Sequence, residues 1–107
     1  MLTGVRLKER TKLFLKKMQG PADTIRLSIL YILAYGELPL HEIVANIDKP
    51  QSLVAHHILF LEKTGWVSKR KAGRETYYRV NDRYFFELIR FVSDSPLYRE
   101  KLAKKLH

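Results

Sequence analysis

Four histidines have the widest chemical repertoire in this sequence, because the chain contains no cysteine. Histidine binds metals and transfers protons near neutral pH. His56 and His57 are neighbours, and neighbouring side chains on a helix point about 100° apart, so these two cannot share a metal within one chain. The lack of thiols excludes disulfide bonds, thiolate metal sites and a cysteine nucleophile.

No group of side chains matches a catalytic motif. The sequence has no Ser/His/Asp set, no glycine-rich phosphate loop and no paired carboxylates in a recognisable spacing. Glu42, Glu62 and Glu87 are typical of solvent-facing helix positions, whereas a small basic nuclease needs clustered acids to hold its metal ions. We therefore predict that the protein is not an enzyme and has no cofactor.

Basic side chains point to a different kind of chemistry. The chain has 20 Lys and Arg against 11 Asp and Glu, a net charge of +9 over 107 residues. Six basic residues and one acidic residue lie in residues 1–20, and five basic and one acidic lie in residues 66–80. A polyanion is the expected partner, with nucleic acid the first candidate and an anionic membrane surface the second.

Length and hydropathy limit the number of domains and the possible location of the protein. The 107 residues suit a single domain, and an apolar content of 46% is enough for a packed core. No apolar run reaches the roughly 18 residues of a membrane-spanning helix. The basic N-terminus is not followed by the apolar stretch of a signal peptide. We expect a cytoplasmic, nucleoid-associated protein with no membrane partner.

Apolar periodicity predicts four helices before residue 65. The first covers residues 5–18 and stops at a Gln-Gly-Pro sequence. The second spans about residues 21–35 and should be the most buried, because its segment 25–33 is apolar nearly all round. A short amphipathic helix follows over residues 40–47, and Pro then begins a fourth helix over residues 50–64.

The pattern then changes to that of strands. Residues 66–70 and 75–80 are short β-prone runs that flank the basic, glycine-containing stretch 71–74, which predicts a β-hairpin. Of its two adjacent tyrosines, Tyr77 and Tyr78, one should pack inward and the other should cover the outer face.

A last helical region begins near residue 82, and the Ser-Asp-Ser-Pro sequence at 93–96 either kinks it or divides it into two helices. The order α-α-α-α-β-β-α, mainly helical with a small β-hairpin wing, is typical of a winged helix-turn-helix domain. The helix-turn-helix would occupy residues 39–65 and the wing residues 66–80.

The fourth helix has a face suited to reading DNA. If Val54, Ile58 and Leu61 face the core, the opposite side carries short or polar groups. Gln pairs with adenine, Ser donates to a base or a phosphate, and Ala contacts a thymine methyl. These candidate contacts are Gln51, Ser52, Ala55 and His56. Lys69, Arg70, Lys71 and Arg74 of the hairpin are candidates for phosphate or minor-groove contacts.

Residues 20–80 resemble the winged helix-turn-helix repressors of the ArsR/SmtB type. The matching segments, in order, are Ala22-Asp23-Thr24-Ile25-Arg26, Ile29-Leu30, Gly36-Glu37-Leu38, His57-Ile58, Gly65-Trp66-Val67 and Gly73-Arg74-Glu75-Thr76-Tyr77-Tyr78-Arg79-Val80. The resemblance implies that a recognition helix at about residues 51–64 enters the major groove. It also implies that the wing, through residues 69–74, reaches the flanking backbone or minor groove.

The end helices, residues 1–20 and 82–107, carry more apolar surface than a monomer can cover. The resemblance implies a homodimer, and a C₂ dimer predicts an inverted-repeat operator in double-stranded DNA. The candidate interface residues are Phe14, Leu15, Met18, Phe85, Leu88, Ile89 and Val92.

The metal sites of the family are missing from this sequence. Pro39 and His41 stand where arsenic and cadmium sensors place cysteines, and the last helix has no histidine before His107. We predict no metal, and the effector stays unknown. His57 is expected to be a packed, hydrogen-bonded side chain.

Two alternatives to a sequence-specific repressor stay open. A low-specificity architectural protein fits the basic first helix and the absence of Lys and Arg on the recognition face. A winged helix used for protein–protein contact would meet an acidic partner instead. The ratio of specific to random duplex binding separates the first of these from a repressor.

Overall fold

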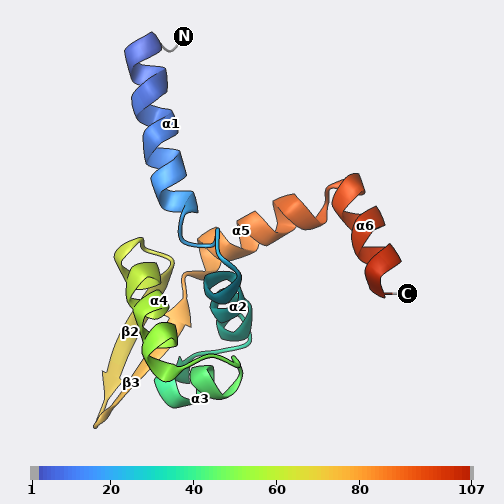
Figure 1. Cartoon of the computed structure of the whole chain (residues 1–107). Helices are drawn as coiled ribbons and strands as arrows, with labels where there is room; N and C mark the ends of the chain where they lie inside the picture. The colour runs from blue at the N-terminus through green and yellow to red at the C-terminus, as the bar shows by residue number, and fades with distance from the viewer. Residues whose placement is uncertain (1–2, 107) are drawn as a thin grey trace.

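The computed structural model describes residues 3–106, apart from the side chain of Asp82. The helices and strands in chain order are α1 (Gly4–Met18), α2 (Thr24–Leu33), β1 (Leu38–Pro39), α3 (Leu40–Ala45), α4 (Gln51–Lys63), β2 (Val67–Ala72), β3 (Glu75–Val80), α5 (Asp82–Ser93) and α6 (Pro96–Leu106). The fold is the predicted winged helix-turn-helix, with α3 and α4 as its helix-turn-helix and β2–β3 as its wing (Figure 1).

The ends of the helices follow the local sequence. The carboxylate of Asp23 caps α2 by accepting the Arg26 backbone N–H at 3.0 Å. Pro50 immediately precedes α4 as its N-cap residue, with extended backbone. The C-terminal region is two helices rather than one kinked helix, because α5 ends at Ser93 and Pro96 begins α6. Proline fits a first helical position, where no backbone donor is needed.

Removing the cap of α2 is expected to destabilise the fold in a pH-dependent way. The hydrogen bond from the Arg26 N–H lowers the pKa of Asp23 below its ordinary value, so the stabilisation is present above that value and is lost as the pH falls through the folded-state pKa. Asp23→Ala should cost about 0.5–2 kcal/mol at pH 7 and less at pH 3, measured by urea unfolding. Asp23→Asn should keep the cap. Thr3→Ala, at the exposed cap of α1, is the matched control, and an equal loss there would contradict the assignment.

The sheet has one strand more than the sequence predicts. Its order is β1-β3-β2, all antiparallel, with Leu38 opposite Tyr78 and Pro39 opposite Tyr77. A two-residue strand that contains proline is too short to show an alternating pattern in the sequence. It forms because β3, far along the chain, pairs with it.

The hairpin turn is shorter than the predicted 71–74 stretch. Lys71 pairs with Thr76 and Ala72 with Glu75, so the strands continue to a two-residue turn of Gly73 and Arg74. Gly73 has φ +64°, as the first position of a type II′ turn requires. The prediction of a four-residue tip is therefore wrong, because cross-strand pairing extends to the turn.

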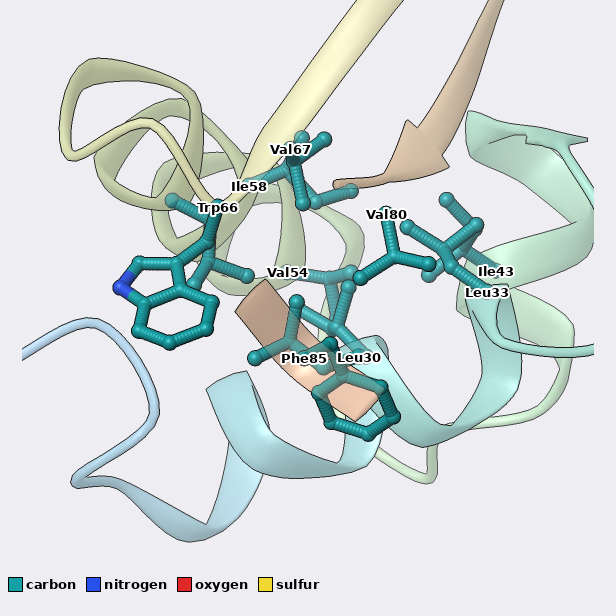
Figure 2. Close-up of a cluster of buried hydrophobic side chains, with 11 residues drawn as sticks. Leu30, Leu33, Ile43, Val54, Ile58, Trp66, Val67, Val80 and Phe85 are labelled. Carbon is teal, nitrogen blue, oxygen red and sulfur yellow. The ribbon is translucent and has the colours of Figure 1, made fainter. Parts of the chain in front are cut away.

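The core lies between α2, α3, α4, the base of the wing and the start of α5 (Figure 2). Leu30, Val54 and Ile58 are almost completely buried there. Phe85 of α5 is only 1% exposed and packs edge-on against Tyr31, with 5.6 Å between ring centroids. Phe85 therefore has almost no surface to offer a partner, and its assignment to a dimer interface is corrected to the core.

The two ends of the chain extend away from this core as arms. In Figure 1, α1 projects to one side of the wing domain while α5 and α6 lead away on another. Neither α1 nor α6 contains a buried residue. The radius of gyration is 16.2 Å, whereas a compact chain of this length has about 13 Å. Within residues 3–106, no helix has both the length and the apolar character needed to cross a bilayer.

Candidate nucleic-acid interface

The helix α4 presents the face that its periodicity predicts. Val54, Ile58 and Leu61 are buried against α2 and the wing. On the other side, Gln51, Ser52 and His56 are exposed and Ala55 is half-buried. Leu53 and Leu59 add apolar surface, with 38% and 45% exposed. The exposed face can therefore offer amide, hydroxyl and imidazole groups to base edges together with small apolar contacts.

The beginning of α4 is an open helix N-terminus. Its N-cap residue, Pro50, makes no capping hydrogen bond through its side chain, and the preceding Lys49 is exposed. The first backbone N–H groups of a helix lack intrahelical partners and lie at the positive end of its dipole. This end can hold a phosphate group.

The wing lies beside this end of α4. Gln51 lines a hollow of about 320 Å³ together with His41 of α3 and with Glu75 and Thr76 of β3. The structure thus brings together a predicted recognition residue and the strand that carries the wing, although they are more than twenty positions apart in sequence.

Two of the four predicted wing cations already have acidic partners in the chain. The Lys69 ammonium lies 3.2 Å from a carboxylate oxygen of Glu62 on α4. The Arg70 guanidinium donates to the carboxylate of Glu37, and this hydrogen bond lowers the pKa of Glu37. Neither pair can be predicted from the sequence, because the contacts of the wing with α4 and with the loop at Glu37 have no local signature.

Lys71 and Arg74 are the cations at the outer end of the wing. Both are exposed, and within residues 3–106 neither forms an ion pair. They are therefore the wing cations with the least competition for a phosphate. For Lys69 and Arg70 to contact phosphate as predicted, each must first release its acidic partner in the chain, Glu62 or Glu37.

The two tyrosines of β3 divide as predicted. Tyr78 is half-buried and packs against the core. Tyr77 lies on the other face of the sheet, where the Arg70 guanidinium stacks 5.1 Å from its ring centroid. Its hydroxyl donates to Glu75 at 3.0 Å. Contacts within the chain therefore account for the position of both tyrosine rings.

Arg26 fixes α4 against the linker between α1 and α2. Its guanidinium donates to the carbonyls of Gly20 at 2.8 Å and Gln19 at 3.0 Å, and it stacks 4.5 Å from the Phe60 ring centroid. It also lies 3.0 Å from Nδ1 of His57. Because a guanidinium only donates, Nδ1 must accept, which places the proton of neutral His57 on Nε2. The prediction of a packed, hydrogen-bonded His57 is confirmed.

The histidines and acidic residues are the side chains that could meet the requirements of a metal site. Residues 3–106, without the Asp82 side chain, contain no group of three or more His, Asp or Glu able to hold a metal ion. His41 is exposed and lies 3.9 Å from carboxylate oxygens of both Glu42 and Glu75. His107 and the Asp82 side chain lie outside the described residues.

Large exposed apolar side chains gather on the arms. They are Val5, Leu7, Leu13, Phe14 and Leu15 on α1, Tyr84, Phe86, Phe91 and Val92 on α5, and Leu97, Leu102 and Leu106 on α6. Among the predicted interface residues, Phe14, Leu15 and Val92 are exposed, whereas Met18, Leu88 and Ile89 are half-buried against the core. Phe86 and Leu13 were not predicted, because the arms are apolar on more than one face.

Comparison with known proteins gives consistent matches over the helix-turn-helix region. A family model described as bacterial regulatory protein, arsR family, matches residues 23–69. The HTH-type transcriptional regulator MJ1325 of Methanocaldococcus jannaschii is 36% identical over 73 residues, which are 67% of this chain and 82% of the relative. The HTH-type transcriptional repressor SmtB of Mycobacterium tuberculosis is 31% identical over 72 residues. The match covers 67% of this chain but only 53% of SmtB.

Solved structures share the fold over nearly the whole chain. The winged helix-turn-helix DNA-binding domain Mb0332 of Mycobacterium bovis superposes with a TM-score of 0.74 at 24% identity, covering 91% of this chain and 93% of that one. Its solution structure is described as homodimeric. An overlap of 91% of this chain extends well beyond the helix-turn-helix, so the likeness is not confined to that motif.

Proposed function

Because the chain belongs to the ArsR family of DNA-binding transcriptional regulators, which are not enzymes, we propose that it is a dimeric repressor of transcription. In this proposal α4 enters the major groove of double-stranded DNA and the wing contacts the flanking backbone or minor groove. Each dimer binds an inverted repeat through two copies of α4. Such a regulator acts in the cytoplasm, on the nucleoid. The repressor role is supported by the name of the relative SmtB.

The observation that carries this proposal is the hollow shared by α4 and the wing. Gln51 lines it from α4 and Thr76 from β3. Lys71 and Arg74 lie beyond it at the outer end of the wing, exposed to solvent. Base contacts specify sequence while phosphate contacts position the protein. The candidate base contacts Gln51, Ser52, Ala55 and His56 include no Lys or Arg. We therefore assign base readout to these groups and most of the affinity to the wing cations.

The dimer is supported by the exposed apolar side chains of the arms. Phe14 is 64% exposed, Phe91 81% and Leu97 61% in the single chain. Clustered exposed apolar side chains are typical of an interface. A C₂ dimer makes each contact twice and places the two recognition helices about one helical turn, roughly 34 Å, apart along the DNA.

A binding selection from random duplex DNA at near-physiological salt tests the proposal, with the oligomeric state followed by light scattering. We expect enrichment of an inverted repeat by a dimer. Tight binding without an enriched motif would favour an architectural protein instead. A chain that ignores duplex DNA would contradict the proposal altogether.

Arg74→Ala should weaken binding to every DNA sequence by a similar factor. The side chain lies at the turn of the wing and has no internal ion-pair partner within residues 3–106. Loss of one phosphate contact should lower the slope of log affinity against log salt by about 1 per site. Affinity measured on operator and random duplex over a salt series checks this. An unchanged slope would show that Arg74 does not contact phosphate.

Gln51→Ala should instead reduce discrimination between DNA sequences. An amide that pairs with adenine contributes about 1–3 kcal/mol of discrimination per base. The ratio of operator to random duplex affinity should therefore fall about tenfold or more, while the salt slope stays unchanged. Exposed Lys63 at the other end of α4 offers a control through Lys63→Gln. If Gln51→Ala weakens operator and random duplex equally, the assignment of the recognition face is wrong.

A further inference from the structure

A further hollow lies away from the recognition face of α4. It has a volume of about 490 Å³ and forms where the end of α2, the base of the wing and the beginning of α5 meet. Its polar lining includes Ser68 of β2, Arg79 of β3, and Asn81 and Arg83 at the start of α5. Glu37 contributes the one carboxylate among the described lining residues.

The fold holds these groups in fixed relation to one another. Ser68 and Arg79 are direct cross-strand partners, so their side chains lie on the same face of the hairpin. The backbone N–H of Asn81 donates to the Trp66 carbonyl at 2.8 Å, which ties the start of α5 to the start of β2. Gly36 lies at the edge of the hollow with φ +143°. A Cβ atom at this position would have no heavy atom within 4 Å, so the hollow is open on that side.

Two arginines and one carboxylate are the charged groups among the described lining residues. Arg79 and Arg83 are exposed, and neither forms an ion pair with another described residue. The carboxylate of Glu37 is already bound by Arg70, which also lowers its pKa. The side chain of Asn81 makes no capping hydrogen bond to α5. The first turn of α5 adds the positive end of a helix dipole.

We propose that this hollow is a binding site for a small organic anion with two or more carboxylate or phosphate groups. Two guanidinium groups supply paired N–H donors that match such oxyanions. The Ser68 hydroxyl and the Asn81 amide supply neutral donors beside them. The volume falls within the range of small-molecule sites, about 300–1,000 Å³. The polar lining disfavours a purely apolar ligand.

The hollow is lined by residues of the wing and of α5, and the proposed repressor depends on the wing for DNA contact and on the α5 arm for dimerisation. Arg79 belongs to the wing, and Arg83 belongs to the helix that leads into the apolar arm. An anion bound by both would tie these two elements together in one fixed arrangement. We infer that it lowers affinity for DNA, a regulatory role that rests on the proposed function, whereas anion binding itself does not depend on it.

Titration with pyrophosphate and with citrate, in the absence of DNA and at constant ionic strength, tests the site directly. We expect saturable binding in calorimetry and amide shifts in NMR centred on Ser68, Arg79 and Asn81. Arg79→Gln and Arg83→Gln should each weaken binding about tenfold, because each removes charge-assisted hydrogen bonds. Arg90→Gln is the matched control, since Arg90 is exposed on the same helix but does not line the hollow.

Two results would overturn the site. One is no saturable binding by either anion to the wild-type chain. The other is equal weakening by Arg79→Gln, Arg83→Gln and Arg90→Gln, which would indicate diffuse attraction by net charge. Circular dichroism on each variant shows that a loss is not due to unfolding.

A parallel DNA titration separates the site from the proposed function. We expect the Arg79→Gln, Arg83→Gln double variant to keep most of its operator affinity and to lose the effect of citrate on it. If the double variant loses DNA affinity and binds pyrophosphate like the wild type, the arginines serve DNA phosphates and the anion site is refuted. If the wild type binds pyrophosphate at this site but no duplex, the site stands and the repressor proposal fails.

Discussion

Phe91→Asp should convert the dimer to monomers and lower operator affinity by at least about 100-fold. Phe91 is 81% exposed in the single chain, so the substitution leaves the core intact. Burial of a Phe side chain contributes about 1.5–3 kcal/mol, and a C₂ interface counts it twice. An aspartate placed there would also be desolvated without a partner. Light scattering and operator titration on the same samples measure both effects.

Tyr35→Asp is the matched control for this substitution. Tyr35 is an aromatic residue that is 95% exposed, but it follows α2 and does not belong to the arms. We expect it to leave the dimer intact. If Phe91→Asp stays dimeric and Tyr35→Asp does not, the interface lies elsewhere. If a monomeric Phe91→Asp variant binds operator as tightly as the wild type, operator binding does not require two recognition helices.

Gly20→Ala should destabilise the fold by about 1–3 kcal/mol, toward the upper end of that range. A methyl group at Gly20 would lie 2.3 Å from Cδ1 and 2.5 Å from Nε1 of Trp66. This ring cannot move easily, because Trp66 is 3% exposed and its indole N–H donates to the Lys17 carbonyl at 2.7 Å. Relief of the clash requires the end of α1 to move away from the core.

Urea unfolding and the fluorescence of Trp66 measure the effect of Gly20→Ala. Trp66 is the only tryptophan in the chain, so a red shift of its emission in the folded state would report exposure of the ring. Gly4→Ala is the control, since its added methyl group meets nothing within 4 Å. It should be neutral or slightly stabilising at the first position of α1. Equal stability of the two variants would contradict the packing of Gly20 against Trp66.

Attachment of the first arm thus depends on a few groups at one junction. Lys17 donates to the Thr64 carbonyl at 2.7 Å and lies 4.6 Å from the Trp66 ring centroid. Arg26 binds the carbonyls of Gln19 and Gly20 from the other side. The direction of α1 is therefore set by groups that also contact α4 and the residues that follow it.

The amino-acid sequence by itself determined the four helices before residue 65, the hairpin that follows them, the buried face of α4 and the basic wing. These features follow from local rules: apolar spacing, proline and glycine at helix ends, and alternation along strands. The buried positions Val54, Ile58 and Leu61 were predicted because one helix has only one way to present such a stripe. The shared motifs around Asp23 and Gly65 indicated the family for the same reason, since they lie in order along the chain.

Only the tertiary structure decided which charged and apolar groups are still available to a partner. Lys69 and Arg70 meet Glu62 and Glu37 across elements, and Phe85 turns into the core while Phe91, on the same helix, does not. Arg79 and Arg83 share one hollow because β3 leads directly into α5 beside β2. These residues are brought together by the packing of separate helices and strands. A local pattern of residue types therefore cannot predict which of them meet.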